Sequence, residues 1–318
     1  MSEKKPRIVF MGTPEIAAYV LKELVVNNYN IAAVVTAPDR PAGRGRKLCI
    51  SEVKKTAIEY DIKVLQPENL NDTNFINELK DISPDIQIVV AFRKLPKEVW
   101  QTPHLCTFNL HASYLPDYRG AAPINWVIIN GEKQTGVTTF IIDDKIDTGK
   151  ILLREKIDIE PYETAGTLHD KIKAKGARLV IKTLEGILDK SLTPIDQKSI
   201  ENEFDNLNKA PKIFKEDCCI DWSRAGDEIA NLIRGLNPVP GAFTEITIKE
   251  NKTVCIKIFE AIPEKFDHTY PVKTILTDNK TYLKITTPDG AIKIKKLQLP
   301  GKKPCKVEEF LRGYNISE

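Results

Sequence analysis

Short, continuous apolar runs recur through the first half of the chain, and stretches with helical spacing separate them. Strands that are buried on both faces carry such unbroken runs, whereas strands with one exposed face alternate apolar and polar residues. The pattern therefore indicates a mostly parallel sheet covered by helices, an α/β architecture of the Rossmann-like kind. The expected strands are 7–11, 31–36, 63–66, 86–92, 107–112 and 137–142.

The turn after the first expected strand reads GTPEIA, at 12–17, instead of the GxGxxG of dinucleotide-binding domains. No dinucleotide is therefore expected. In this turn Thr13 can cap a helix and Pro14 suits its first position. A later helix is expected over about 164–188, where it closes the α/β part of the chain.

The last third of the chain has different elements. Residues 193–212 are polar and lose periodicity, which is typical of a linker. Beyond them a helical segment is followed by short β-like runs, with PDG at 288–290 as a turn. We expect a small β-barrel of the oligonucleotide-binding type. A chain of 318 residues has room for two cores, so the predicted domains are 1–192 and 213–318, joined by the linker 193–212.

Several classes of protein are disfavoured by the sequence. No apolar run reaches the roughly 18 residues that span a bilayer. The chain passes from charged residues straight into an expected strand, without the pattern of a secretory signal. The six cysteines show no CxxC and no regular framework, and the Cys/His spacing of a zinc site is missing. We therefore expect a cytoplasmic protein with reduced thiols, no metal and no membrane partner.

Two basic clusters contrast with a small net charge of +3. In PDRPAGRGRKL, at 38–48, the single acid Asp39 accompanies four cations, Arg40, Arg44, Arg46 and Lys47. Between Asp289 and Glu308 there are six lysines and no acid, namely Lys293, Lys295, Lys296, Lys302, Lys303 and Lys306. Such clusters fit an anionic partner such as nucleic acid, although a solvated lysine face is the commoner origin of any one of them.

Two polar residues end the expected strand 107–112. Side chains two apart in a strand share a face, so Asn109 and His111 point the same way while Leu110 points to the other side. Polar residues at strand ends often only meet solvent, so the pair by itself leaves both explanations open. Ligands of open α/β sheets bind outside the carboxyl ends of the strands, and this is such an end.

Four stretches resemble the methionyl-tRNA formyltransferases, a group within the folate-dependent formyltransferase family, and the resemblance covers essentially the whole chain. They are GTPEIAA at 12–18, PDRPAGRGRKL at 38–48, NLHASYLPDYRGAAPI at 109–124 and IDTG at 146–149. A weaker fifth stretch is IDWS at 220–223. The N-x-H…D pattern is shared by enzymes of this fold that handle formyl-tetrahydrofolate, whereas the PDRPAGRG loop and the barrel point to the tRNA enzymes among them.

The resemblance implies a reaction and a role for three side chains. Enzymes of this group move a formyl group from 10-formyltetrahydrofolate to the amino group of methionyl initiator tRNA. Asn109 would donate a hydrogen bond to the formyl oxygen, on which negative charge grows. His111 would stabilise that charge as imidazolium or move a proton. Asp147 would hold the imidazole, while Asp143 and Asp144 are expected to be solvated loop charges.

The resemblance also implies where the substrates bind. The folate contact of the family, a Ser-Leu-Leu-Pro stretch, corresponds to Ser113, Tyr114, Leu115 and Pro116, with Tyr in place of the first Leu. A second departure is Arg93, in AFRKLP, where many members have Gly near the pterin pocket. For tRNA, the implied contacts are the four cations of 38–48 and Lys215, although a lone lysine in a linker is usually only solvated. No obligate protein partner is expected.

Two alternatives remain at this point, and a third is set aside. Another folate-dependent formyltransferase or deformylase, acting on a sugar nucleotide or a small amine, would share the Asn, His and Asp but would not need the basic loop. A non-catalytic RNA-binding protein would explain the barrel but not these three residues. Asp-Thr-Gly also resembles half of an aspartic protease site, but the second triplet that such a site requires is absent.

Overall fold

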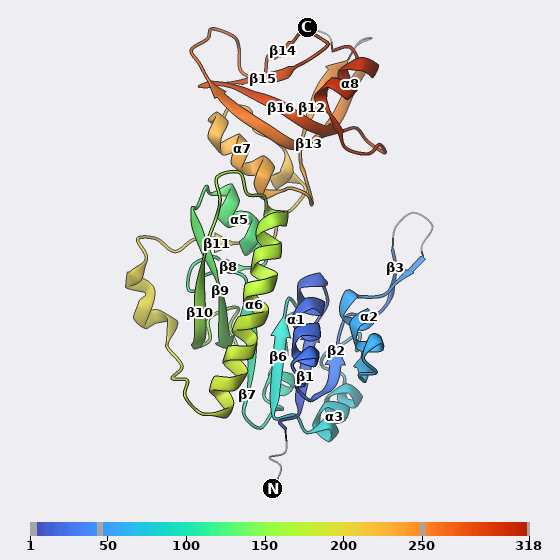
Figure 1. Cartoon of the computed structure of the whole chain (residues 1–318), viewed down its shortest axis with the longest axis vertical. Coiled ribbons are helices and arrows are strands. Elements are labelled where there is room, and N and C mark those ends of the chain that lie inside the picture. Colours follow the sequence, from blue (N-terminus) through green and yellow to red (C-terminus); the bar gives the residue numbers. More distant parts are fainter. Residues whose placement is uncertain (1–4, 43–46, 249–251, 317–318) are drawn as a thin grey trace. The chain divides into compact units, whose positions relative to one another are not determined.

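In the computed structural model, which describes residues 5–42, 47–248 and 252–316, seven strands form the main sheet (Figure 1). Their spatial order is β10 (Ile151–Asp158), β9 (Gln134–Ile141), β7 (Cys106–His111), β6 (Ile86–Val90), β1 (Ile8–Gly12), β2 (Ile31–Val35) and β5 (Val64–Leu65). The five strands from β7 to β5 are parallel, and β9 runs antiparallel to β7. The predicted Rossmann-like α/β sheet is confirmed.

The direction in which the chain builds this sheet defines where a ligand can bind. From β1 the chain moves outward to β2 and β5, and then returns to the other side of β1 to add β6 and β7. The strand order therefore reverses between β1 and β6. In open α/β sheets, the carboxyl ends of the strands beside such a reversal are the usual place for a ligand.

Apolar contacts fix which way each side chain of the sheet points. Val9 and Val89 pack in one cluster with side chains of α3 (Thr73–Ile82) and α4 (Lys97–Trp100). On the opposite face, Leu110 lies against Gly176 of α6 (Ala165–Leu188), where a Cβ on the glycine would come within 2.8 Å of Leu110 Cδ2. Helices α1 (Glu15–Val26) and α2 (Glu52–Glu59) complete the layers.

One detail of the expected α1 is wrong. The helix begins at Glu15 with Pro14 as its N-cap, and no side chain caps it, so Thr13 does not have the predicted role. The turn is constrained instead by Gly12. A Cβ at that position would lie 2.5 Å from Ala17 Cβ and 2.9 Å from the carbonyl oxygen of Val90. The glycine thus permits β1, β6 and α1 to approach closely.

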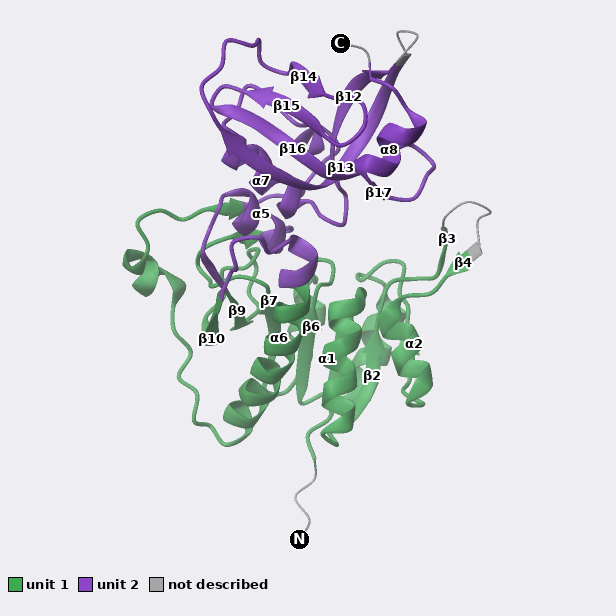
Figure 2. Cartoon of the chain, turned by 45° about the horizontal axis from the view of Figure 1, so that its top comes forward, with its two compact units in different colours: residues 1–120, 136–157, 169–209 green, residues 121–135, 158–168, 210–318 purple. Residues whose placement is uncertain are grey.

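The chain divides into two compact units, drawn in green and purple in Figure 2. Unit 1 comprises 1–120, 136–157 and 169–209, and unit 2 comprises 121–135, 158–168 and 210–318. Helix α5 (Pro123–Ile129) belongs to unit 2, where it packs on α7 (Gly226–Gly235) and Asn125 donates a hydrogen bond to the carbonyl of Gly235 (2.7 Å). The domain boundaries expected from the sequence stay a prediction.

Unit 2 contains an antiparallel sheet in the order β12 (Ala242–Ile248), β13 (Lys252–Lys265), β16 (Gly290–Gln298), β15 (Leu283–Thr287) and β14 (Ile275–Thr277). Strand β17 (Cys305–Lys306) pairs with β16 and leads into α8 (Val307–Gly313). The register of β13 shifts between Ile258 and Ala261, which lets this long strand bend around the core. This is the expected barrel of the oligonucleotide-binding type.

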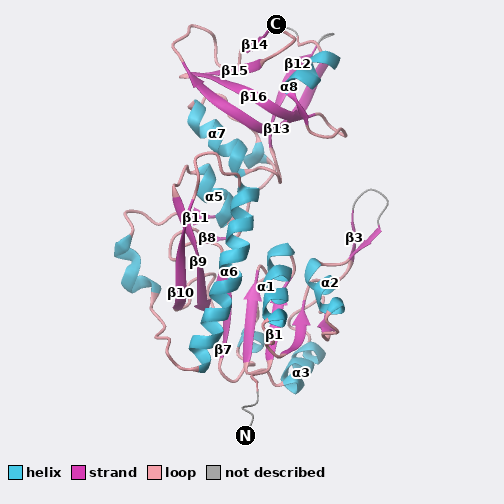
Figure 3. Ribbon diagram, in the orientation of Figure 1, coloured by secondary structure: helices cyan, strands magenta, loops and turns pink. Residues whose placement is uncertain are grey.

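The remaining elements are short. Strands β3 (Arg40–Ala42) and β4 (Lys47–Cys49) pair as a hairpin that stands apart from the main sheet of unit 1 (Figure 3). Strands β8 (Arg119–Gly120) and β11 (Lys209–Ala210) and two 3-10 helices, η1 (Gln197–Glu203) and η2 (Glu216–Cys218), complete the fold. No helix in the described ranges has both the length and the apolar character needed to cross a membrane.

All six cysteines are free. Burial raises the pKa of the Cys106 thiol to about 11, which keeps it protonated at neutral pH. Cys49, Cys219 and Cys255 are exposed instead. Among the described residues, no group of three or more His, Cys, Asp or Glu side chains is arranged to hold a metal ion.

Candidate active site

Strand β7 brings Asn109 and His111 to one face at its carboxyl end. Asn109 is paired with Val89 of β6 on one side and with Phe140 of β9 on the other. It is half-buried, and its carboxamide forms no hydrogen bond with any residue that the structure describes. Because Leu110 packs on the α6 side, both polar side chains face the opposite side of the sheet. The amide N–H groups of Asn109 are thus free to donate to a ligand.

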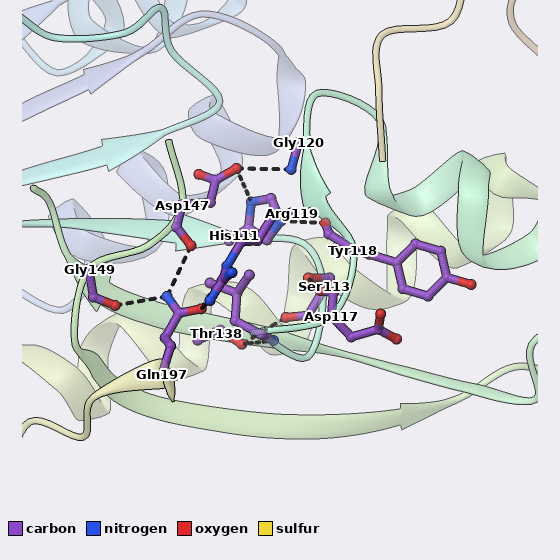
Figure 4. A network of polar contacts seen from close by, with 11 residues as sticks. His111, Ser113, Asp117, Tyr118, Arg119, Gly120, Thr138, Asp147, Gly149 and Gln197 are labelled. Carbon is purple, nitrogen blue, oxygen red and sulfur yellow. Dashed lines mark hydrogen bonds and ion pairs between the residues drawn. The ribbon is translucent and has the colours of Figure 1, made fainter. Parts of the chain in front are cut away.

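His111 is 6% exposed and lies between two oxygen atoms. Its Nε2 is 3.0 Å from the carbonyl oxygen of Tyr118, and its Nδ1 is 3.8 Å from Asp147 Oδ2, which is an ion-pair contact longer than a hydrogen bond. Figure 4 shows the ring between these two partners. These two oxygen atoms fix the orientation of the ring.

Asp147 is held in an uncommon conformation by its loop. Its φ of 56° is left-handed, a region that Asp adopts more readily than most residues. The backbone N–H of Gly120 donates to Asp147 Oδ2 (3.0 Å), so one carboxylate oxygen contacts both this amide and the His111 ring (Figure 4). A Cβ on Gly149 would lie 1.6 Å from the carbonyl oxygen of Ile141. The loop therefore requires glycine two residues after the aspartate.

The other two acids of this loop do not reach His111. Asp143 accepts hydrogen bonds from the Thr148 hydroxyl (2.9 Å) and from the Lys145 backbone N–H (3.0 Å), so it caps its own loop. Asp144 is exposed. Of the three carboxylates in IIDDKIDTG, Asp147 is the one that the structure brings to the end of β7.

The side chains of the expected folate contact are mostly engaged within the protein. Ser113 is fully buried, and its hydroxyl donates to the carbonyl of Asp117 (2.6 Å). Leu115 is also fully buried. The Thr138 hydroxyl donates to the Ser113 carbonyl (2.7 Å) and accepts from the Leu115 N–H (3.0 Å). Pro116 is buried as well. The side chains thus fix the shape of this segment.

Tyr114, the departure from the family pattern, has a partner of its own. The guanidinium of Arg154 lies 4.4 Å from the centre of the Tyr114 ring, and the Lys156 ammonium lies 5.4 Å from it. Both distances are within the range of cation–π contacts. Arg154 also donates to the carbonyl of Leu115 (3.2 Å). The aromatic ring thus serves to fasten the 113–116 segment to β10.

Arg93 connects two loops at the carboxyl edge of the sheet. Its guanidinium donates to the carbonyl of Glu68 (2.7 Å) and to that of Pro67. Partial burial and then the charge of Arg40 lower the pKa of Arg93, although an arginine remains charged at neutral pH. The loop after β6 is therefore tied to the loop after β5.

The basic loop expected at 38–48 is only partly described. Arg40 is exposed in β3, the backbone of Lys47 lies in β4, and Arg44 and Arg46 lie outside the described residues. At the base of the hairpin, Lys54 is 2.5 Å from Asp39 and Gln66 donates to it (2.8 Å). These two contacts, led by that of Lys54, lower the pKa of Asp39. These contacts with Asp39 hold the start of the hairpin in place.

The other expected tRNA contacts lie in the C-terminal part of the chain. Lys215 is exposed directly before η2. Within the lysine cluster, Lys293 is 3.6 Å from Glu264 and Lys296 is 3.5 Å from Glu260, so these two lysines are paired with acids that are distant in the sequence. The net charge around these two lysines is therefore smaller than the number of lysines in this stretch suggests.

Sequence reasoning missed Arg119 and Gln197, which complete the polar network around Asp147 (Figure 4). Gln197 lies in the segment expected to be a solvated linker, yet it is 1% exposed. It receives hydrogen bonds from Arg119 and donates to the carbonyls of Asp147 and Gly149. A polar residue in a polar, non-periodic stretch gives no sign of burial, so the sequence carried no signal for this contact.

Comparison with protein families matches two models to this chain. The model described as formyl transferase matches residues 6–184, and the model described as formyl transferase, C-terminal domain, matches residues 212–315. A methionyl-tRNA formyltransferase from Bacteroides thetaiotaomicron is 46% identical over 318 residues, which span 100% of this chain and 98% of the relative. A methionyl-tRNA formyltransferase from Flavobacterium johnsoniae is 49% identical over 315 residues, which span 99% of this chain and 98% of the relative.

Solved structures with the same fold are more distant in sequence. WlaRD, a sugar 3N-formyl transferase whose structure was solved in the presence of dTDP and 5-N-formyl-THF, is 23% identical with a TM-score of 0.65, and the match covers 94% of this chain and 100% of that chain. HypX from Aquifex aeolicus, solved with tetrahydrofolic acid, is 20% identical with a TM-score of 0.63 and covers 99% of this chain and 49% of that chain. These likenesses concern the fold.

Proposed function

The chain belongs to the formyl transferase family, and from this premise we propose that it transfers the formyl group of 10-formyltetrahydrofolate to the amino group of methionyl initiator tRNA. The product is the formylmethionyl-tRNA that begins translation, so the enzyme would act in the cytoplasm. The observation that carries the proposal is the identity of 46–49% to methionyl-tRNA formyltransferases along the whole chain, through both matched regions. Asn109 and His111, at the end of β7, are proposed to act on the formyl group during the transfer.

The proposed reaction replaces one C–N bond by another. The methionyl amine attacks the formyl carbon, the bond from that carbon to N10 of the folate breaks, and the proton lost by the amine is taken up at N10. Negative charge develops on the formyl oxygen on the way. Asn109 has free amide N–H groups at the carboxyl end of β7, and a pre-positioned donor aimed at such an oxygen stabilises the charge.

His111 is proposed to lie beside the same oxygen, where it can stabilise the charge as imidazolium or move a proton. Its two nitrogens face the Tyr118 carbonyl and the Asp147 carboxylate, which fixes the orientation of the ring. The ring is nearly inaccessible to water, which strengthens its interaction with developing charge. Asp147 holds the ring and supports it when it takes up a proton that leaves the amine.

The folate is proposed to lie along the carboxyl edge of the sheet, near 113–116. The segment is held rigidly by Thr138 and by the Arg154–Tyr114 contact, so it can present a fixed surface to a flat ring system. Ser113 and Leu115 point into the protein, and the contribution of the segment is therefore assigned to its shape and backbone. Arg93 would form part of the neighbouring wall.

The tRNA is proposed to contact the hairpin of β3 and β4 and the region around Lys215. Arg40 and Lys215 are both exposed, and cations placed on a projecting hairpin can reach phosphates without disturbing a core. The hydrogen-bonded base at Asp39 would hold the hairpin in place as it does so.

A sugar-nucleotide N-formyltransferase is the alternative with the most support, because WlaRD shares the fold. At 23% identity, however, that likeness concerns the fold and not the substrate. The basic hairpin is explained by a tRNA substrate, whereas a small amino sugar would leave it without a role.

A direct assay separates these alternatives. The protein is incubated with 10-formyltetrahydrofolate and one acceptor at a time: methionyl initiator tRNA, the same tRNA uncharged, or a dTDP-linked amino sugar. We expect formylation of the charged tRNA, with a catalytic efficiency at least about 100-fold above that for the sugar, because the hairpin and barrel contribute binding only to tRNA. Formylation of the sugar in preference to the charged tRNA would overturn the proposal.

The roles of the three loop carboxylates can be tested by matched substitutions. Asp147→Asn keeps the shape of the side chain but removes the charge beside His111, so turnover should fall by about 100-fold while folate affinity changes little. Asp143→Asn and Asp144→Asn are the matched controls and should retain turnover within about 3-fold. If either control were the crippling change, Asp147 would lose the role proposed for it.

The hairpin can be tested through the salt dependence of tRNA binding. Neutralising Arg40, Arg44, Arg46 and Lys47 should weaken tRNA binding and leave folate binding unchanged. The slope of log affinity against log salt should also fall, by about 0.7–0.9 for each phosphate that the variant no longer neutralises. The control neutralises four exposed lysines elsewhere in unit 1, namely Lys22, Lys80, Lys97 and Lys190. Equal slopes for the two variants would show that the cations of 38–48 are ordinary solvated charges that do not contact phosphates.

A further inference from the structure

Gln197 is a buried polar residue whose side chain is fully used. Its Nε2 donates to the carbonyl of Asp147 (3.0 Å) and to that of Gly149 (2.8 Å). Its Oε1 accepts from Arg119, at 3.0 Å from Nε and 2.7 Å from Nη2. A glutamine amide offers two N–H donors and one oxygen with two lone pairs, and all of them have partners here. With an exposure of 1%, the side chain has no contact with water that could replace them.

The partners of Gln197 surround one residue of the candidate active site. Asp147 is held through its backbone carbonyl by Gln197 and through its carboxylate by the N–H of Gly120. Gly120 directly follows Arg119, whose guanidinium donates two hydrogen bonds to Gln197. Residues from two segments that are 78 positions apart in the chain thus converge on the two ends of Asp147.

The conformation of Asp147 makes such a support necessary. A left-handed φ of 56° is less favourable for Asp than the ordinary regions, so a loop keeps it only where surrounding contacts impose it. Gly149 fixes the far side of the turn because it lies against the Ile141 carbonyl. On the near side, the two hydrogen bonds from Gln197 bind the backbone of the turn, and the Gly120 N–H binds the Asp147 carboxylate.

We propose that Gln197, which accepts two hydrogen bonds from Arg119, is a positioning residue that keeps the Asp147 carboxylate beside the His111 ring. The inference rests on the proposed function, in which Asp147 supports His111. It assigns a task in catalysis to η1, the first part of the polar segment that follows α6. The Asp147–His111 separation of 3.8 Å is already longer than a hydrogen bond, so even a small shift of the turn would weaken the contact.

The test uses Gln197→Met, which keeps the length of the side chain and removes all four hydrogen bonds. Turnover should fall by about 10- to 100-fold, as expected for a displacement of a catalytic group by roughly 1 Å, while the KM values for folate and tRNA stay within about 3-fold. The control is Ser199→Ala in the same 3-10 helix, since Ser199 is exposed and its hydroxyl donates to the Asp196 carbonyl. The control should retain the turnover of the unmodified protein.

A double-mutant cycle distinguishes positioning from a general structural role. In an Asp147→Asn background the charge that Gln197 places is already gone, so adding Gln197→Met should lower turnover by less than about 2-fold. A further loss as large as in the unmodified background would overturn the proposal. Turnover of Gln197→Met equal to that of the Ser199→Ala control would overturn it as well.

Hydrogen exchange gives a readout that does not depend on the reaction. The amides of 143–149 should exchange faster in Gln197→Met than in Ser199→Ala, while those of β1 and β6 stay equally protected. Unchanged exchange at 143–149 contradicts the positioning role, whatever the enzyme formylates. If Gln197→Met does not fold, Gln197→Glu provides the same test, because it keeps an oxygen for Arg119 and loses the N–H donors to the two carbonyls.

Discussion

The alternation of side chains along β7 is the constraint on which the whole site depends. Leu110 packs against Gly176 of α6, and this contact places its side chain on the helix side of the sheet. A shift by one residue would turn Asn109 and His111 toward the helix and Leu110 toward the ligand. The apolar packing of the sheet therefore decides where the two polar groups point, before any contact with a substrate.

The second requirement is a carboxylate at a fixed place beside the buried imidazole of His111. Asp147 comes from a loop between β9 and β10, and it reaches His111 only because the loop takes a left-handed turn at that residue. Backbone groups of Tyr118 and Gly120 supply the other contacts of the pair. The site is thus assembled from one strand and two loops, and Gln197 of η1 donates hydrogen bonds to the loop that carries Asp147.

The sequence predicted those features that depend on local pattern. Continuous apolar runs indicated the parallel strands, and the spacing of Asn109 and His111 was enough to place them on one face. The choice of Asp147 over Asp143 needed the family resemblance, because all three acids of the loop look alike in composition. The expected cap at Thr13 was wrong, since Pro14 occupies the N-cap and close packing at Gly12 shapes the turn.

Features that depend on distant contacts could not be predicted. Gln197 meets Arg119 from 78 positions away, and nothing in a polar segment reveals that one of its residues is buried. Similarly, Tyr114 looked like a departure within the folate contact, whereas its ring meets Arg154 from the distant strand β10. In both cases the partner, rather than the residue itself, explains the choice of side chain.

Asn109 and His111 are proposed to act on one oxygen atom, the formyl oxygen. Single-turnover formylation with saturating 10-formyltetrahydrofolate can test this proposal, using Asn109→Ala, His111→Ala and the double variant. Groups that stabilise the same developing charge act as a unit, so we predict a loss of about 100-fold or more for each single change and a double loss well below the product of the two. A double loss equal to that product, or near-normal rates in either single variant, would contradict the account.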